Sequence, residues 1–224
     1  MTVLAPREAY RLWAPSYEAE NAITWLEQGL VERLGPSPAG RRLLDAGCGT
    51  GRRLAGTGAA RAVGIDLSPE MLAQGRANPE LEGVELVEGD FRALPLPDGA
   101  FDLVWCRLAI GHVAELAAAY REFARVAAAG AAVIVTDFHP EAWAAGHRRS
   151  FRVSGDVHEA MHHLHSVEAQ VEAARQAGLA LRAKNEAAIG PEVRRFYEEA
   201  GRSALYREHL GLPVVLALVF ERDG

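Results

Sequence analysis

The chain has 224 residues, of which 49% are hydrophobic, and it carries a formal net charge of −6. This length supports one substantial core and predicts a single domain over residues 1–224. The acidic balance argues against nucleic acid and membranes as partners, and the lack of a signal-peptide pattern or a long apolar run leads us to expect a cytoplasmic protein.

The N-terminal part, residues 1–40, predicts a helical cap. Apolar side chains at helical spacing predict one helix over residues 8–34, which the sequence G-P-S-P ends. Three aromatic side chains, those of Tyr10, Trp13 and Tyr17, lie around a proline in this part. They either pack an N-terminal arm or form a lid over a ligand.

The next part of the chain alternates apolar strands with helices. Strands are expected at residues 41–46, 62–67, 84–87, 101–106 and 131–136. Helices are expected at residues 52–58, at 69–76 and from 113 to Gly130. Because parallel strands need long crossover connections, this alternation predicts an α/β fold with helices on both faces of a mostly parallel sheet.

The last third departs from this alternation. Residues 141–166 are polar, histidine-rich and weakly periodic, so we expect an insertion after the fifth strand. Further elements are expected as a helix at 167–178, a strand at 179–189, helical material at 191–207 and a strand at 213–220. No standard crossover joins the last two strands, so an antiparallel last strand completes a seven-stranded, Rossmann-like sheet.

The sequence L-L-D-A-G-C-G-T-G at residues 43–51 is typical of a buried strand that ends in a cofactor-binding turn, although a plain tight turn fits the isolated motif equally well. Asp66 follows the second strand, where it can accept from both hydroxyls of a ribose. Asp90 follows the third strand and is placed to accept from an adenine amino group. A dinucleotide site has G-x-G-x-x-G, so the spacing G-x-G-x-G favours an adenosine cofactor without a diphosphate.

Four stretches in order resemble the class I S-adenosylmethionine (SAM)-dependent methyltransferases of the small-molecule type, similar to the ubiquinone/menaquinone and biotin-pathway enzymes. They are L-L-D-A-G-C-G-T-G, G-I-D-L-S-P-E-M-L at 64–72, E-G-D-F-R-A-L-P-L-P-D-G-A-F-D-L-V-W-C at 88–106 and R-E-F-A-R-V-A-A-A-G-A-A-V-I-V at 121–135. The resemblance implies a SAM-binding core over residues 41–138. Ala129 and Ala131 replace the family's usual proline and glycine, which affects only the turn before strand five.

The resemblance also implies how the chain contacts SAM. Gly47 and Gly49 would face the methionine part, with Arg107 beside it and Tyr17 closing over it. Asp66 would hold the ribose, Leu67 would pack on adenine, and Asp90 with the Phe91 backbone would meet the adenine amino group. The expected cofactor-binding residues are Tyr17, Asp45, Gly47, Cys48, Gly49, Asp66, Leu67, Asp90, Phe91 and Arg107.

Methyl transfer depends mainly on orientation and desolvation, and a general base helps where the acceptor is a hydroxyl. His112, after the fourth strand, and His139, after the fifth, are the candidate catalytic residues, and each could instead only bond the backbone at a strand end. The histidine run at 158–165 is expected to line or cover the acceptor pocket, and no metal site is expected. Residues 141–166 and 190–212 should overhang the acceptor side.

The sequence therefore predicts a SAM-dependent methyltransferase with a small-molecule acceptor and with neither nucleic acid nor a membrane as partner. An NAD(P)-dependent oxidoreductase is a second hypothesis, which the glycine spacing and Asp90 disfavour. A non-catalytic SAM-binding protein of the same fold is a third. The sequence leaves open the acceptor, the methylated atom (O, N, C or S) and the oligomeric state. Cys48 and Cys106 are expected to be reduced thiols.

Overall fold

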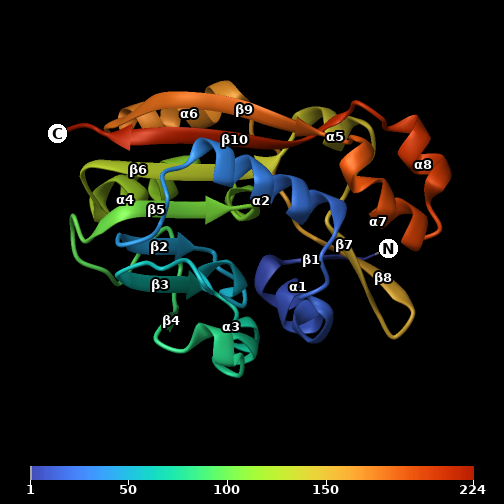
Figure 1. The fold of residues 1–224 in the computed structure, drawn as a ribbon, viewed down its shortest axis with the longest axis horizontal. Helices are drawn as coiled ribbons and strands as arrows, with labels where there is room; N and C mark the ends of the chain where they lie inside the picture. Colours follow the sequence, from blue (N-terminus) through green and yellow to red (C-terminus); the bar gives the residue numbers. More distant parts are fainter. Residues whose placement is uncertain (1) are drawn as a thin grey trace.

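The computed structural model describes residues 2–224 and has a seven-stranded sheet at its centre (Figure 1). Its strands are β2 (Arg42–Ala46), β3 (Arg61–Asp66), β4 (Glu85–Glu88), β5 (Phe101–Arg107), β6 (Ala127–Phe138), β9 (Leu179–Ala188) and β10 (Pro213–Arg222). They lie in the order β4-β3-β2-β5-β6-β10-β9, and β10 runs antiparallel to both of its neighbours. The predicted α/β fold with an antiparallel last strand is confirmed.

The strand order reverses beside β2. This strand pairs in parallel with β3 on one side and with β5 on the other, so successive connections leave it in opposite directions. In open α/β sheets, ligands bind at the carboxyl ends of the strands at such a reversal. The cofactor site is therefore expected where β2 ends in the glycine turn.

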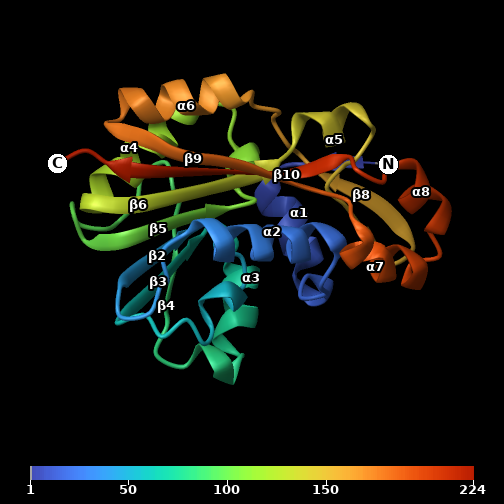
Figure 2. The same ribbon diagram turned by 45° about the horizontal axis from the view of Figure 1, so that its top comes forward.

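Helices cover both faces of this sheet. One face carries α2 (Ala22–Leu34), which contacts β9 and β10, and the other carries α4 (Leu116–Val126) and α6 (Val167–Gln176) (Figure 2). Another helix, α3 (Pro69–Arg76), follows β3 and begins where the Ser68 hydroxyl accepts from the Met71 N–H, as expected from the sequence. The strands between these layers are apolar and fully buried, as at Leu43 and Leu44.

The prediction of one N-terminal helix over residues 8–34 is wrong. The chain forms α1 (Pro6–Trp13), a short 3₁₀ turn (Ala14–Ser16) and then α2. Pro15 lies in the 3₁₀ turn, and Asn21 starts a new helix because its side chain accepts from the N–H groups of Ile23 and Thr24. This break bends the chain, so that α1 and α2 are separate elements.

The insertion after β6 is more regular than its sequence suggests. It contains α5 (Pro140–Ala144) and a hairpin of β7 (Ser150–Val153) and β8 (Asp156–Ala160). The N-terminal strand β1 (Thr2–Leu4) pairs in parallel with β8, which makes a separate three-stranded sheet. Its apolar side packs Phe151 and Ala160 against Ala9 of α1. The N-terminal cap and the insertion therefore form one structure beside the carboxyl ends of the main strands.

Two other boundaries differ from the prediction. Residues 52–58 form only a 3₁₀ turn, Arg52–Leu54, rather than a helix. The helix expected to end at Gly130 is α4, which ends at Val126, and β6 begins directly after it. Gly130, with a φ of 72°, lies where the pairing of β6 with β5 shifts register, so its left-handed conformation serves a bulge inside the strand.

The remaining helical material after β9 comprises a 3₁₀ turn (Pro191–Val193), α7 (Arg194–Glu199) and α8 (Ser203–Glu208). These two helices lie beyond the end of the main sheet, near the hairpin of β7 and β8 (Figure 1). Within residues 2–224, no helix has both the length and the apolar character that crossing a bilayer requires. Cys48 and Cys106 are both buried and free, as expected.

Candidate active site

The glycine turn after β2 folds tightly onto β3. The N–H groups of Gly47 and Cys48 both donate to the Ile65 carbonyl, at 2.8 and 3.0 Å. Gly47 has a φ of 82°, and a Cβ on it would lie 2.5 Å from the Ala109 Cβ. A Cβ on Gly49 would lie 3.5 Å from the ring of Tyr17. Only glycine fits the turn, and the ring of Tyr17 packs directly over it.

Asp66 faces the same turn from the end of β3. Its carboxylate accepts from the Gly49 N–H at 2.7 Å and from the Ser68 N–H at 2.9 Å. Burial raises the pKa of this carboxyl, and the main-chain N–H groups of Ser68 and Gly49 offset part of that rise. A carboxylate has about four lone-pair positions, and those that the main-chain N–H groups leave free can accept from hydroxyl groups of a ligand.

A small cavity of about 50 Å³ lies between this turn and α1. It is lined by Pro6, Arg7, Tyr10, Tyr17, Gly47, Gly49, Asp66, Leu67, Ser68, Phe91, Arg107, Leu108, Ala109, His112 and Arg149. The structure thus brings together seven of the ten residues expected to bind the cofactor, and α1 covers them.

The other three expected residues lie outside this lining. Asp45 and Cys48 are buried behind the turn, and neither oxygen of Asp45 has a hydrogen-bond partner within residues 2–224. Burial raises the pKa of Asp45 to about 6. Asp90 is half-exposed, and both of its oxygens accept from the Arg92 side chain, whose hydrogen bonds lower the pKa of the carboxyl. Asp90 nevertheless precedes Phe91, which does line the cavity.

The Arg107 side chain is held in place by a carboxylate of α2. Its Nε and Nη2 donate to the two carboxylate oxygens of Glu27, each at 2.8 Å. Arg53 also approaches Glu27, at 3.3 Å, and the Thr136 hydroxyl donates to it at 2.9 Å. Burial alone would raise the pKa of Glu27, but Arg53 and Arg107 lower it to about 2. One carboxylate therefore pairs with two buried guanidinium groups beside the turn.

His112 takes part in a buried chain of hydrogen bonds. Its Nδ1 lies 2.9 Å from the Met161 carbonyl, which can only accept, so Nδ1 carries the proton and Nε2 is an acceptor. Nε2 receives the Tyr10 hydroxyl at 2.8 Å, and Arg149 Nη1 donates to the same hydroxyl at 2.6 Å. Burial lowers the pKa of His112 well below its usual range, so the imidazole is neutral.

His139 has a different environment. Its Nδ1 accepts from the Glu141 N–H at the start of α5, and its Nε2 lies 3.4 Å from Glu186. It lines neither the small cavity nor the larger one described next. Of the histidine run at 158–165, His162 is buried against the ring of Trp143 and lies 3.5 Å from Asp137. The four histidines of this run line neither cavity.

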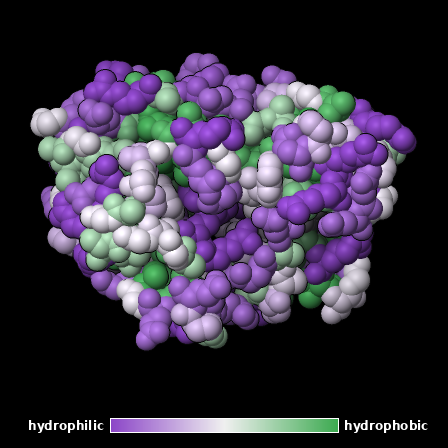
Figure 3. Space-filling model, viewed as in Figure 1, coloured by the Kyte–Doolittle hydropathy of each residue, from purple (hydrophilic) through white to green (hydrophobic). Residues whose placement is uncertain are grey.

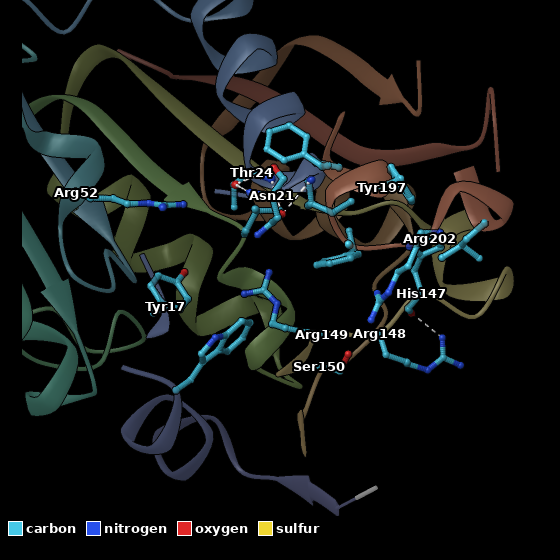
Figure 4. Close-up of a pocket in the computed structure, with 18 residues that line it drawn as sticks. Tyr17, Asn21, Thr24, Arg52, His147, Arg148, Arg149, Ser150, Tyr197 and Arg202 are labelled. Carbon is cyan, nitrogen blue, oxygen red and sulfur yellow. Dashed lines mark hydrogen bonds between the residues drawn. The ribbon is translucent and has the colours of Figure 1, made fainter. Parts of the chain in front are cut away.

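A larger cavity of about 320 Å³ adjoins the first, and Tyr17, Leu108 and Arg149 line both (Figure 4). Its remaining lining consists of Trp13, Asn21, Ala22, Ile23, Thr24, Arg52, Phe138, His147, Arg148, Ser150, Phe196, Tyr197, Ala200, Arg202 and Leu205. The face in Figure 3 has a hollow near its centre that hydrophilic residues surround. Residues from both segments 141–166 and 190–212 line this cavity.

The sequence did not identify Arg149 or Asn21 as site residues. Arg149 precedes β7 in the insertion, and its guanidinium points toward Asn21 at the start of α2 (Figure 4). Arg52 enters from the opposite side, after the glycine turn. Nothing in the local sequence distinguishes these arginines from surface ones. A helix start at Asn21, followed by Thr24 as the second member of a capping box, was readable from the sequence.

The strand order, the glycine turn and Asp66 at the carboxyl ends of the strands define the SAM-binding core of a class I methyltransferase. Residues 44–135 match the family model described as a methyltransferase domain. The resemblance predicted from the sequence, and SAM as the cofactor of the family, are confirmed.

The chain is similar to known methyltransferases over about half of its length. A demethylmenaquinone methyltransferase of Thermus thermophilus is 34% identical over 57% of this chain and 63% of that protein. A malonyl-[acyl-carrier protein] O-methyltransferase of Halorhodospira halophila is 40% identical over 50% of this chain and 40% of that protein. The chain thus spans less than two thirds of the length of either relative.

The fold is also found in solved structures. A SAM-dependent methyltransferase from Mesorhizobium loti superimposes with a TM-score of 0.69, covering 88% of this chain and 98% of that one at 24% identity. At this identity the likeness shows the shared fold, so the reaction has to be argued from the site itself.

Proposed function

We propose that this protein transfers a methyl group from SAM to a small-molecule acceptor. The proposal rests on the wall shared by the two cavities, which Tyr17, Leu108 and Arg149 form. A cofactor held at the glycine turn and an acceptor in the larger cavity would meet at this wall. The two relatives named above are methyltransferases, in agreement with this reaction.

The residues present fit SAM. The free lone pairs of Asp66 suit the two ribose hydroxyls, and Leu67 and Phe91 supply apolar surface for adenine. The glycine turn exposes its main chain where the methionine part would lie, and Tyr17 would cover that part. Asp90 now accepts from Arg92 on both carboxylate oxygens, so it stays our candidate acceptor for the adenine amino group only if the Arg92 side chain moves away when SAM binds.

When bound, SAM supplies a methyl carbon that bonds to the acceptor atom as its bond to sulfur breaks and the electron pair stays on sulfur. The chain's contribution is to align the two reactants and exclude water, which can be worth ~7–11 kcal/mol. Tyr10 and Tyr17 exclude water from the shared wall, since their rings pack edge to face at 5.7 Å. No charged group of the chain has to form a covalent bond.

His112 is our candidate base for an acceptor that must lose a proton. Its Nε2 lone pair is directed at the Tyr10 hydroxyl beside the cavity, and the Met161 carbonyl fixes this tautomer. Because Tyr10 occupies the Nε2 lone pair, the acceptor's proton would pass to the Tyr10 oxygen as the Tyr10 proton moves to Nε2. In that case His112→Gln lowers kcat by ~10²–10⁴-fold. An unchanged kcat with a hydroxyl acceptor would contradict the base role. His139, which caps α5 outside both cavities, is not part of this proposal.

Ligand-induced thermal stabilisation tests the proposed function. SAM or its demethylated product at 100 times Kd should stabilise the chain by ~2.7 kcal/mol, whereas NAD(H) should have no effect. Asp66→Asn should weaken SAM binding at least tenfold, because each charge-assisted hydrogen bond contributes ~1.5–3 kcal/mol. The matched control is Asp102→Asn, whose carboxylate pairs with Arg42 at the opposite end of the strands. Stabilisation by NAD(H) and not by SAM would overturn the proposal.

A further inference from the structure

The larger cavity is strongly basic for a protein that is acidic overall. Four arginines line it, namely Arg52, Arg148, Arg149 and Arg202, and no aspartate or glutamate is among its lining residues. The same chain has a net charge of −6. Such a concentration of one sign of charge in a concave, partly enclosed site raises the local concentration of ligands of the opposite charge.

Arg149 is the most informative of these residues because it is buried without a carboxylate partner. Its exposed fraction is 9%, and within residues 2–224 no ion pair forms with it. The other two arginines buried in this region, Arg53 and Arg107, share Glu27. A buried cation normally has a charged partner, since its desolvation is otherwise uncompensated. Arg149 is the exception among the three.

The groups that contact Arg149 are neutral, and at least one N–H donor of its guanidinium has no acceptor among them. Its Nη1 donates to the Tyr10 hydroxyl and lies 3.3 Å from the unprotonated Nε2 of His112. Its Nε is buried and has no hydrogen-bond partner within the part of the chain that the structure describes. The guanidinium also lies over the ring of Phe138, 5.2 Å from the centroid. None of these contacts supplies a negative charge. The buried Asp137 carboxyl attracts the guanidinium at longer range but forms no ion pair or hydrogen bond with it within the described residues.

The first turn of α2 adds to the positive potential. Asn21, Ala22, Ile23 and Thr24, the capping residue and the first three residues of this 13-residue helix, all line the cavity. The Asn21 side chain already accepts from the Ile23 and Thr24 N–H groups, so this terminus contributes through the helix dipole, which is positive at its start. In Figure 4 the Arg149 guanidinium points toward Asn21, so the two positive features face the same space.

The remaining walls are apolar and aromatic. Trp13, Phe138 and Tyr197 line the cavity beside the arginines. Its volume of about 320 Å³ is at the lower end of the range for small-molecule sites. An acceptor that fills it has an apolar or aromatic body and an anionic group.

We propose that the methyl acceptor is a small oxyanion, a carboxylate or a phosphate with an apolar body, whose negative group pairs with the buried Arg149. This inference rests on the proposed function in one respect, namely that the bound anion is the molecule that receives the methyl group. Arg149 lines both cavities, so the anion is held beside the point where the methyl group is delivered. Binding of the anion itself does not depend on methyl transfer.

The test measures anion binding by titration calorimetry, with and without the demethylated cofactor. The probes are phenylacetate, phenyl phosphate and the neutral phenylacetamide, which has nearly the shape of the carboxylate. Phenylacetate or phenyl phosphate should bind and phenylacetamide should not, and whichever anion binds more tightly identifies the acidic group. Arg149→Met should lower the affinity for the anion by about 10- to 100-fold. Arg149→Lys, which keeps the charge, should recover part of this loss.

The matched control is Arg182→Met, an exposed arginine that pairs with Glu221 on the distant β9–β10 edge, and it should leave anion binding unchanged. Because Arg149→Met removes a hydrogen bond to Tyr10 of α1, it could also affect the packing of that helix. Arg52→Gln therefore provides a second variant at the opposite wall, and it should lower the affinity for the anion too. Equal binding of the amide, full anion affinity in Arg149→Met, or no binding of either anion in the millimolar range would each overturn the proposal. Failure of SAM to bind, with anion binding intact, would instead refute the proposed methyl transfer.

Discussion

Replacing Glu27 by glutamine would remove the carboxylate that pairs with two buried arginines beside the glycine turn. Glu27 is fully buried, and Arg107 donates to both of its oxygens at 2.8 Å. Arg53 lies 3.3 Å from the second oxygen. An amide has the same shape but no charge, and it turns an N–H group toward one guanidinium. The two buried cations would then keep only the longer-range attraction of the buried Asp45, with which neither forms an ion pair within residues 2–224.

The expected loss of stability is large. Removing one partner of a buried ion pair costs ~3–5 kcal/mol, which is a substantial part of the ~5–15 kcal/mol that stabilises a typical fold. For a chain of this size, that corresponds to a fall in Tm of about 6–20 °C. Urea denaturation and thermal unfolding of Glu27→Gln would measure both quantities.

Glu85→Gln is a control with the same geometry at the surface. Arg61 donates to both oxygens of Glu85 at 2.8 and 3.0 Å, but the two side chains are 40% and 52% exposed. Solvent screening limits such a pair to ~0–1 kcal/mol. If the two variants lost equal stability, burial would not be the source of the effect and the reasoning would fail.

The pH dependence separates a charge effect from a packing effect. The pKa of Glu27 falls from 4.5 to about 2 on folding, so its ionised form stabilises the fold fully above pH 4.5 and this contribution disappears as the pH falls toward 2. The stability difference between the wild type and Glu27→Gln should therefore be constant above pH 5 and shrink in acid. A difference that persists unchanged at low pH would show that the variant acts by steric disruption.

Three further predictions concern single sites. Burial raises the pKa of Asp137 from 3.8 to about 7, so ionisation of this carboxyl destabilises the fold as the pH rises from 4 to 8. The stability of Asp137→Asn minus that of the wild type, measured by urea unfolding, should therefore be larger at pH 8 than at pH 4. Equal differences at the two pH values would refute this. Gly47→Ala should abolish SAM binding because its Cβ would clash with Ala109, whereas Gly40→Ala, also at positive φ but in open space, should leave calorimetric SAM affinity unchanged. Burial raises the pKa of Cys48 and Cys106 well above 9, so a thiol reagent should label neither in the folded protein and both in urea; rapid labelling under native conditions would contradict their burial.

The main sheet was predictable from the sequence because its information is local. All seven strands were predicted, the central ones from continuous apolar runs bounded by turns, and the glycine turn marked the end of β2. The same local patterns placed Asp66 at the end of β3, where the structure has it. The bulge around Gly130 could not be predicted, because a glycine after a helix is equally typical of a helix end.

The structure of the acceptor side could not be predicted from local sequence patterns, because the segments that form it are distant in the sequence. Thr2 of β1 pairs with His158 of β8, and Arg149 donates to Tyr10 of α1. Both contacts join the N-terminus to the insertion after β6. A polar, histidine-rich stretch gives no indication of such a partner, since its hairpin is stabilised by the strand and helix that pack on it. The cavity exists only once these segments have met.

This construction links the two ligands. The N-terminal segment that covers the cofactor cavity with Tyr10 and Tyr17 also holds Arg149, the residue at the wall of the acceptor cavity. A cofactor that orders this segment would also fix the position of Arg149, and by thermodynamic linkage an anion bound to Arg149 would increase cofactor affinity by the same factor. We therefore expect the anion to bind more tightly when the demethylated cofactor is present, and the calorimetric titrations with and without it measure this coupling directly.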